Sequence, residues 1–217
     1  IAAWVAIVSG SFIWNYSEAV KARQEIALQT AKSFFDQIVI TRKWNAQHGG
    51  VYVPVTEATQ PNPYLPIPDR DLRIDTDLTL TKINPSFMTR QISEIALQQE
   101  GTKFRITSLR PLSPENTPNL REQQALEVFE GGEQEVGEFT DNAGVPSFFY
   151  MAPLITEKAC LQCHASQGYK EGDIRGGISV TLPFRQDIPV VSGDHWHPFL
   201  WNENRELHQK TATEIGD

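Results

Sequence analysis

Apolar positions recur at three- and four-residue intervals through the first quarter of the chain, a spacing that predicts one long helix. Residues 1–16 (IAAWVAIVSGSFIWNY) carry no charged side chain. From about Asn15 to Ala46, apolar residues share the helix with charged residues on its other faces, and no glycine follows in this part until Gly49. Glycine directly after a helix is a common C-terminal stop. We therefore expect an apolar N-terminal run that continues without a break into an amphipathic helix.

Beyond residue 50 the pattern changes to short β-rich runs, separated by turns and two further helices. Asn84 stands at the cap position and Pro85 at the first position of the second helix. The tetrapeptide Asp141-Asn142-Ala143-Gly144, between two β-rich runs, predicts a hairpin. The predicted helices are 86–99 and 120–130; the predicted strands are 51–55, 78–81, 104–109, 133–140, 146–155 and 176–182; the proline-rich stretch 56–77 is a predicted loop. This order predicts an α+β fold, an antiparallel sheet with flanking helices.

The apolar run at the N-terminus predicts a membrane anchor over residues 1–17. A membrane-spanning helix needs about 20 apolar residues, so the run is slightly short. Trp4 and Trp14 are suited to the two membrane interfaces. A cleaved signal peptide is the alternative, because its apolar core has a similar length. Ser9-Gly10-Ser11 is followed by further apolar residues, which favours an uncleaved anchor joined to a connecting helix over 18–48.

The charge balance excludes one class of partner. A formal net charge of −8 argues against nucleic acid, which binds basic surfaces. Hydrophobic content of 40% is that of an ordinary folded protein. We find no nucleophile–base pair or carboxylate pair at a telling spacing, so we do not expect an enzyme.

The two cysteines of the chain, Cys160 and Cys163, form a C-x-x-C-H motif with His164. This is the attachment site of a c-type haem, in which each thiol forms a thioether and the adjacent imidazole is an axial ligand of the iron. We therefore predict one covalent haem c. In bacteria this attachment takes place outside the cytoplasm. The motif thus predicts a domain in the periplasm, held at the bacterial inner membrane by the N-terminal helix.

Three other uses of the cysteines remain as alternatives. A redox dithiol also uses C-x-x-C, although it ordinarily opens a helix after a strand. A zinc site needs two further ligands, which His195 and His197 are able to supply. A structural disulfide is the third alternative.

Several separated blocks resemble one known family. They are Arg42-Lys43-Trp44-Asn45-Ala46-Gln47-His48-Gly49-Gly50-Val51-Tyr52-Val53, Pro61-Asn62-Pro63-Tyr64, Asn84 to Arg90, Thr107 to Pro111, the haem motif with Gln167-Gly168-Tyr169, and Asp173 to Gly177. In this order they resemble the c-type haem, PAS-like periplasmic sensor domains found at the N-termini of bacterial histidine kinases and diguanylate cyclases and as stand-alone haem proteins. The resemblance covers about residues 15–184. It implies a PAS-like haem domain over 49–184, followed by a C-terminal tail over 185–217.

The candidate ligand of the second axial position is His48, which stands at a helix end beside two glycines. A histidine that caps the last helical carbonyls is the other interpretation. Met88 is the alternative ligand and Met151 a weaker one, and a vacant position is also possible. Arg90, Arg110 and Arg175 lie in the family-like blocks and are candidates for the haem propionates. Tyr52 is a further candidate cofactor contact, and Tyr64 and Tyr169 either line the haem or pack in the core.

Two functions are consistent with these features. The first is redox or ligand sensing by a membrane-anchored c-type cytochrome domain, with a homodimer formed through residues 18–46. The second is electron transfer as an accessory haem subunit of a respiratory or photosynthetic membrane complex, a role favoured by the aromatic tail after Phe184.

Overall fold

The computed structural model describes residues 1–142 and 144–184, so the predicted tail, with His195 and His197, lies outside the described residues. The helices are α1 (Ala2–Gln47), α2 (Pro85–Glu100), α3 (Leu120–Glu130) and the short α4 (Leu161–His164); three 3-10 turns, η1 (Pro114–Asn116), η2 (Lys158–Cys160) and η3 (Ala165–Gln167), lie among them. The strands are β1 (Val51–Pro54), β2 (Asp71–Arg73), β3 (Thr79–Ile83), β4 (Lys103–Thr107), β5 (Val136–Asn142), β6 (Val145–Ile155) and β7 (Ile174–Pro183). The prediction of an α+β fold with a long N-terminal helix is confirmed.

The described strands form two sheets, where the sequence predicted one. β1, β3 and β2 make a three-stranded sheet in that order, and β4, β7, β6 and β5 make a four-stranded sheet. Every pairing is antiparallel, and the predicted hairpin is β5–β6. The prediction missed that β1 and β3 pair with each other and with no strand of the four-stranded sheet; β2, a three-residue strand inside the predicted proline-rich loop, adds to the other edge of β3.

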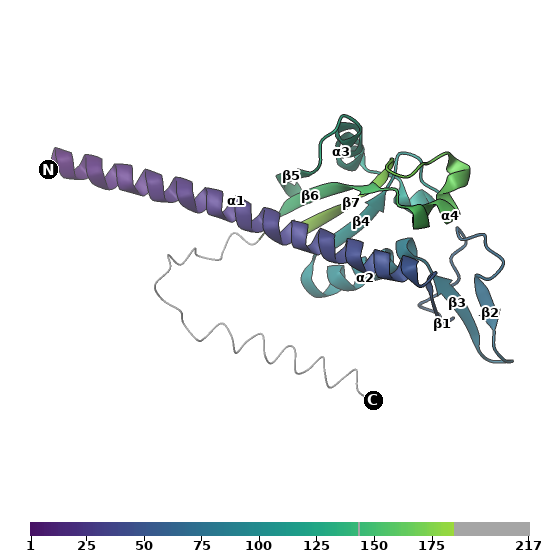
Figure 1. Cartoon of the computed structure of the whole chain (residues 1–217). Helices are drawn as coiled ribbons and strands as arrows, with labels where there is room; N and C mark the ends of the chain where they lie inside the picture. Colours follow the sequence, from purple (N-terminus) through teal and green to yellow (C-terminus); the bar gives the residue numbers. More distant parts are fainter. Residues whose placement is uncertain (143, 185–217) are drawn as a thin grey trace. The chain divides into compact units, whose positions relative to one another are not determined.

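The four-stranded sheet is buried on both faces. Side chains alternate between the two faces of a strand, and in β6 this alternation sends Phe148 and Tyr150 into one apolar cluster with α1 and β4, while Phe149 and Met151 enter another with α3. Figure 1 shows α1 and α2 on one side of this sheet and α3 on the other. The sheet therefore forms the middle layer of the domain.

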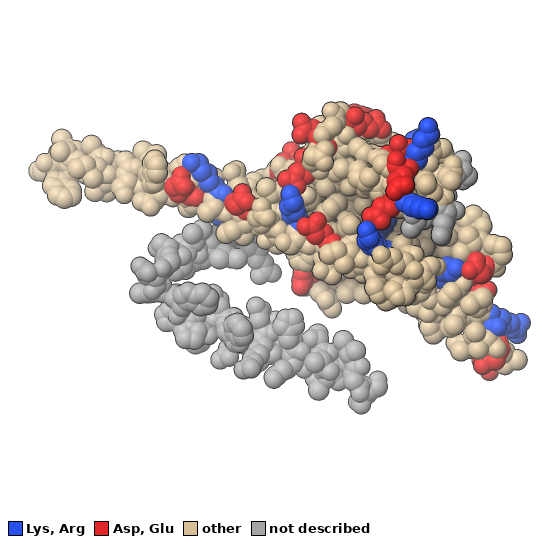
Figure 2. All heavy atoms as spheres, in the orientation of Figure 1, with Lys and Arg blue, Asp and Glu red and all other residues tan. Residues whose placement is uncertain are grey.

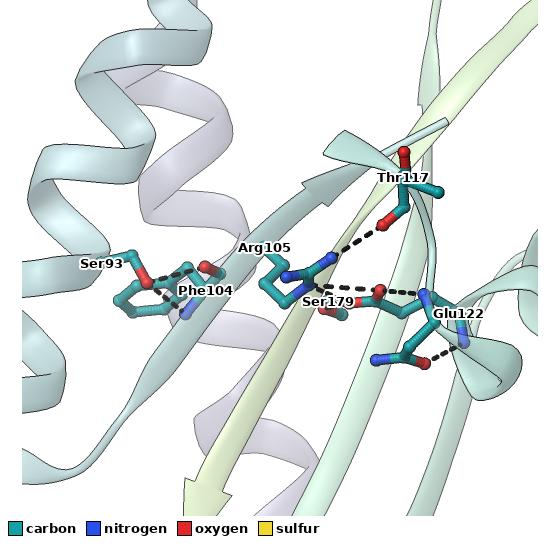
Figure 3. Close-up of polar contacts among 7 residues, drawn as sticks. Ser93, Phe104, Arg105, Thr117, Glu122 and Ser179 are labelled. Carbon is teal, nitrogen blue, oxygen red and sulfur yellow. Dashed lines mark hydrogen bonds and ion pairs between the residues drawn. The ribbon is translucent and has the colours of Figure 1, made fainter. Parts of the chain in front are cut away.

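Two polar clusters fix helices to the four-stranded sheet (Figure 3). In α2, the buried hydroxyl of Ser93 donates to the carbonyl of Phe104 at 2.7 Å and accepts from its amide at 2.9 Å. In α3, the carboxylate of Glu122 accepts from Arg105 Nε at 3.0 Å and from Ser179 Oγ at 2.7 Å. Because both clusters join a helix to a strand, they set the positions of α2 and α3 on the sheet.

Just after Arg23, whose guanidinium lies over the ring of Phe184, the second half of α1 packs against the domain. Its buried residues are Ala27, Ala31, Ile38, Arg42 and Asn45. The preceding part extends away from the sheet (Figure 1), and its first turns present apolar side chains with no Lys, Arg, Asp or Glu among them (Figure 2). Within the described residues, no helix reaches the length and mean hydropathy required of a membrane span.

A polar contact fixes the middle of α1. Lys32 Nζ lies 2.8 Å from Glu135 Oε2, which also accepts from the hydroxyl of Tyr150 at 2.8 Å. The hydrogen bond from Lys32 is the main cause that lowers the pKa of Glu135, followed by the bond from Tyr150. In turn, the hydrogen bond to Glu135 raises the pKa of Lys32.

We expect the contribution of Glu135 to stability to depend on pH. A carboxylate with a lowered folded-state pKa stabilises the fold above the ordinary Glu pKa of about 4.3, and this contribution is lost as the pH falls through the lowered value. Because both side chains are more than one-third exposed, the effect is below about 1 kcal/mol. Urea unfolding of the parent and Glu135→Gln at several pH values measures it. The difference between the two proteins is expected at neutral pH and should vanish in acid; a constant difference contradicts the prediction.

Candidate haem site

The C-x-x-C-H motif lies in a compact helical turn between β6 and β7. Cys160 ends η2, Cys163 and His164 lie in α4, and η3 follows directly. Gly168 ends the turn with φ +86°, a left-handed conformation that suits glycine. The backbone amide of Glu157 lies 3.4 Å from Cys160 Sγ and closes the first turn of the motif. Both cysteines and the histidine are thus held in one continuous helical segment.

The ring of His164 is oriented by its neighbour Gln167. His164 Nδ1 lies 2.6 Å from Gln167 Oε1, and Gln167 Nε2 donates to the carbonyl of Arg110 at 3.2 Å. Since a carbonyl accepts only, it fixes the orientation of the Gln167 amide, and the amide oxygen must then accept a proton from Nδ1. Nε2 of His164 is therefore the nitrogen with the lone pair. Burial is the main cause that lowers the pKa of His164, which keeps the ring neutral at physiological pH.

A cavity of about 540 Å³ lies beside His164. This volume falls within the range of about 300–1,000 Å³ that is usual for cofactor and ligand sites. The wall is formed by the 62–67 loop, the start of α2, the end of β4 with the following loop, the haem-motif turn and the start of β7. The lining residues are Arg42, Asn62, Pro63, Tyr64, Leu65, Pro66, Ile67, Asn84, Ser86, Arg90, Ile106, Thr107, Ser108, Arg110, Pro111, Leu112, Ser113, Asn116, Leu154, His164, Gln167, Tyr169, Arg175 and Gly176.

The charged side chains that line the cavity are all cationic. They are Arg42, Arg90, Arg110 and Arg175, and among the described lining residues none is Asp or Glu. Arg90 forms an ion pair with Glu115, outside the lining. The guanidinium of Arg110 lies over the ring of Tyr169, 4.6 Å from its centroid. A wall of this composition favours a ligand that carries negative charge.

Arg42 is the one lining arginine that sequence reasoning did not select as a site residue. It is 7% exposed, and its Nη1 donates to the carbonyl of Pro85 at 2.9 Å and to Thr89 Oγ1 at 3.1 Å. Burial is the main cause that lowers its pKa to about 9, and the positive charge of Arg175 adds to the effect, so Arg42 remains charged at neutral pH. Arg42 lies in the first family-like block of the sequence, and this position is the signal that could have identified it as a site residue.

Among the predicted site residues, Cys160, His48, Met88 and Tyr52 lie outside the cavity lining. His48 is exposed at the end of α1, where its Nδ1 lies 2.8 Å from the carbonyl oxygen of Trp44 and its ring lies 4.5 Å from the Trp44 ring. The sulfur of Met88 accepts from Asn45 Nδ2 at 3.5 Å. The hydroxyl of Tyr52 donates to the carbonyl of Asp69. The structure therefore assigns these side chains local contacts, and in particular shows His48 as a helix cap.

Of the other candidates, Tyr64 and Tyr169 line the cavity, whereas Met151 is fully buried in the apolar cluster with α3. Arg90, Arg110, Arg175 and His164, which come from four separate parts of the chain, are brought together around one space.

The cavity wall also contains buried polar atoms without partners. Thr107 Oγ1, Ser113 Oγ and Arg175 Nε have no hydrogen-bond partner among the described residues. A buried polar atom without a partner costs about 1–3 kcal/mol. Such atoms along one wall are consistent with a polar ligand that completes their hydrogen bonds. A haem offers two carboxylates and an iron, so the free imidazole nitrogen, the four arginines and these atoms fit it.

The fold and the site define an α+β domain with a cationic cavity built against a C-x-x-C-H turn. The chain belongs to the Tll0287-like family, whose model matches residues 16–183. This match confirms the family resemblance seen in the separated sequence blocks.

Among solved structures, the chain is similar to the crystal structure of the cyanobacterial heme-protein Tll0287. The two chains are 21% identical with a TM-score of 0.44, and the alignment covers 79% of this chain and 98% of the other. No curated protein matches the chain.

Proposed function

We propose that this chain is a membrane-anchored, extracytoplasmic c-type cytochrome domain with one covalent haem, which acts in redox or ligand sensing and not as an enzyme. The observation that carries the proposal is His164, whose Nε2 is left free at a cationic cavity while Nδ1 is held by Gln167. A ligand histidine whose second nitrogen is fixed in this way is typical of metal sites in proteins. Family membership supports the same cofactor, since the similar solved protein is described as a heme-protein.

Each residue has a defined task in this proposal. Cys160 and Cys163 form the thioethers, and His164 is the axial ligand. Gln167 holds the imidazole in the tautomer that a metal requires. Arg90, Arg110 and Arg175 are donors for the propionates, since charge-assisted hydrogen bonds from arginine suit carboxylates. When bound, the haem supplies an iron that changes by one electron or takes a further ligand.

The contacts of α1 favour sensing. Arg42 lines the cavity, and its neighbour Lys43 lies 3.2 Å from Glu157, whose amide contacts Cys160. Two consecutive residues of α1 thus contact the site, and the same helix continues into the exposed apolar segment. In this proposal, α1 carries a change at the haem towards the membrane or towards a second copy paired through residues 18–46.

Electron transfer in a membrane complex is the second candidate. Tyr64 and Leu112 line the cavity and are 41% and 52% exposed. Partly exposed apolar side chains at the mouth of a haem site are suited to contact with a redox partner. Copurification with other redox subunits favours this function, whereas dimerisation that depends on the haem oxidation state favours sensing.

The cofactor proposal is tested on the full chain produced in a bacterial periplasm with a haem-attachment system. The parent is expected to keep its haem through acidified-acetone extraction, and Cys160→Ala/Cys163→Ala to lose it. His164→Ala is expected to keep the thioethers but to show an altered Soret band. His48→Ala, outside the lining, is the matched control and should retain the parental spectrum; a changed spectrum would support His48 as the ligand of the second axial position. A colourless parent refutes the proposal.

A further inference from the structure

We propose that Arg42 and Arg175 favour the reduced state of the bound haem and thereby raise its reduction potential. This inference rests on the proposed function. Reduction removes one positive charge from the iron, so cations fixed near the haem oppose the oxidised state more than the reduced one. The arginines therefore act by charge, without being ligands of the iron.

The first step of the argument is that Arg42 is fixed in place. Its guanidinium is almost fully buried, and Nη1 donates to two acceptors at the start of α2, the carbonyl of Pro85 and the hydroxyl of Thr89. A side chain held by two hydrogen bonds inside the protein is not free to turn towards solvent. The charge therefore stays at the cavity wall when the iron changes its oxidation state.

Arg175 is the second cation at the cavity wall. It lies at the start of β7, and its carbonyl accepts from Ser108 Oγ at 2.8 Å, which ties this position to the end of β4. Its Nε is buried without a partner among the described residues. Arg42, Arg175 and His164 line the same cavity. Both cations are therefore near enough to the axial ligand to influence the iron.

Negative charge near these two arginines is scarce. Within the described part of the chain, neither Arg42 nor Arg175 forms an ion pair, whereas Glu115 pairs with Arg90 and Glu157 with Lys43. Even with both propionates ionised, the four arginines leave an excess of positive charge at the cavity.

The test is a spectroelectrochemical titration of the haem-loaded full chain. Arg42→Gln and Arg175→Gln are each expected to lower the equilibrium constant for reduction by about tenfold, which corresponds to about 59 mV for a one-electron couple. Arg73→Gln is the matched control, since Arg73 is an exposed arginine of β2 outside the cavity lining, and its potential should equal that of the parent.

A second pair of variants separates charge from structure. Arg42→Lys and Arg175→Lys keep the positive charge but lose the guanidinium geometry. Their reduction potentials should therefore lie closer to that of the parent than to those of the glutamine variants. If both glutamine variants load haem and retain the parental potential, or if the lysine variants fall as far as the glutamine variants, the inference is wrong. Failure of the parent to bind haem refutes the proposed function instead, so the two failures are distinguishable.

Discussion

Replacement of Glu122 by alanine is expected to lower the free energy of unfolding by about 3–5 kcal/mol, the usual cost of removing one partner from a buried ion pair. Glu122 is 1% exposed and accepts from Arg105 Nε at 3.0 Å, from Ser179 Oγ at 2.7 Å and from the amide of Asn119 at 3.0 Å. The variant leaves these donors without their acceptor and opens a space between α3 and the sheet (Figure 3).

Urea unfolding followed by circular dichroism measures this effect. Glu127→Ala is a matched control in the same helix, because Glu127 is exposed and its hydrogen bond is to the exposed Gln123. A change within about 0.5 kcal/mol is expected there. A loss below about 1 kcal/mol for Glu122→Ala would show that the cluster does not hold α3 on the sheet.

Gly176→Ala is expected to destabilise the domain by about 3 kcal/mol or more and to reduce haem loading. At this position φ is +154°, and a Cβ atom would lie 2.2 Å from the carbonyl oxygen of Thr107. Backbone strain of this kind costs about 1–3 kcal/mol, and overpacking costs a similar amount. Since Gly176 lines the cavity, separation of β7 from β4 also displaces the neighbouring Arg175.

Gly172→Ala is the control for backbone strain alone. It has φ +93°, but a Cβ atom there has no heavy atom within 4 Å. Its cost should be nearer 1 kcal/mol, with unchanged haem loading. Thermal unfolding and the ratio of Soret to protein absorbance report the two quantities. Equal losses for both variants would mean that the close approach of Gly176 to Thr107 has no effect.

The helices of the domain follow from local sequence chemistry. Residues 120–130 are helical as predicted, and Asn84 caps α2 by accepting from the amide of Phe87 at 2.9 Å. The second sheet was missed because it depends on the pairing of β3 with β1 and β2, partners that local periodicity does not reveal. Pairing between strands from separate parts of the chain, not local propensity, decided the number of sheets.

The candidate site was predictable to the extent that its residues lie in recognisable blocks. His164, Arg90, Arg110 and Arg175 were identified and do line one cavity. The interpretation of Arg42 required the fold, because only the packing of α1 against α2 shows that this cation is buried. Tyr52 also lies in a family-like block, but it is outside the cavity lining and its hydroxyl donates to the carbonyl of Asp69.

Because α1 is unbroken, it fixes the orientation of the domain relative to the N-terminal part of the helix. Residues 2–26 precede its first buried position, and at 1.5 Å per residue they form a rod of about 38 Å. An α-helix turns by about 100° per residue, so the number of residues between the apolar N-terminal surface and Arg42 fixes the angle between them around the helix axis. An insertion or deletion of residues between them would rotate Arg42 around the helix axis relative to the apolar surface. The number of residues in this part of α1 thus sets the direction in which the cavity faces relative to the apolar N-terminal surface of the helix.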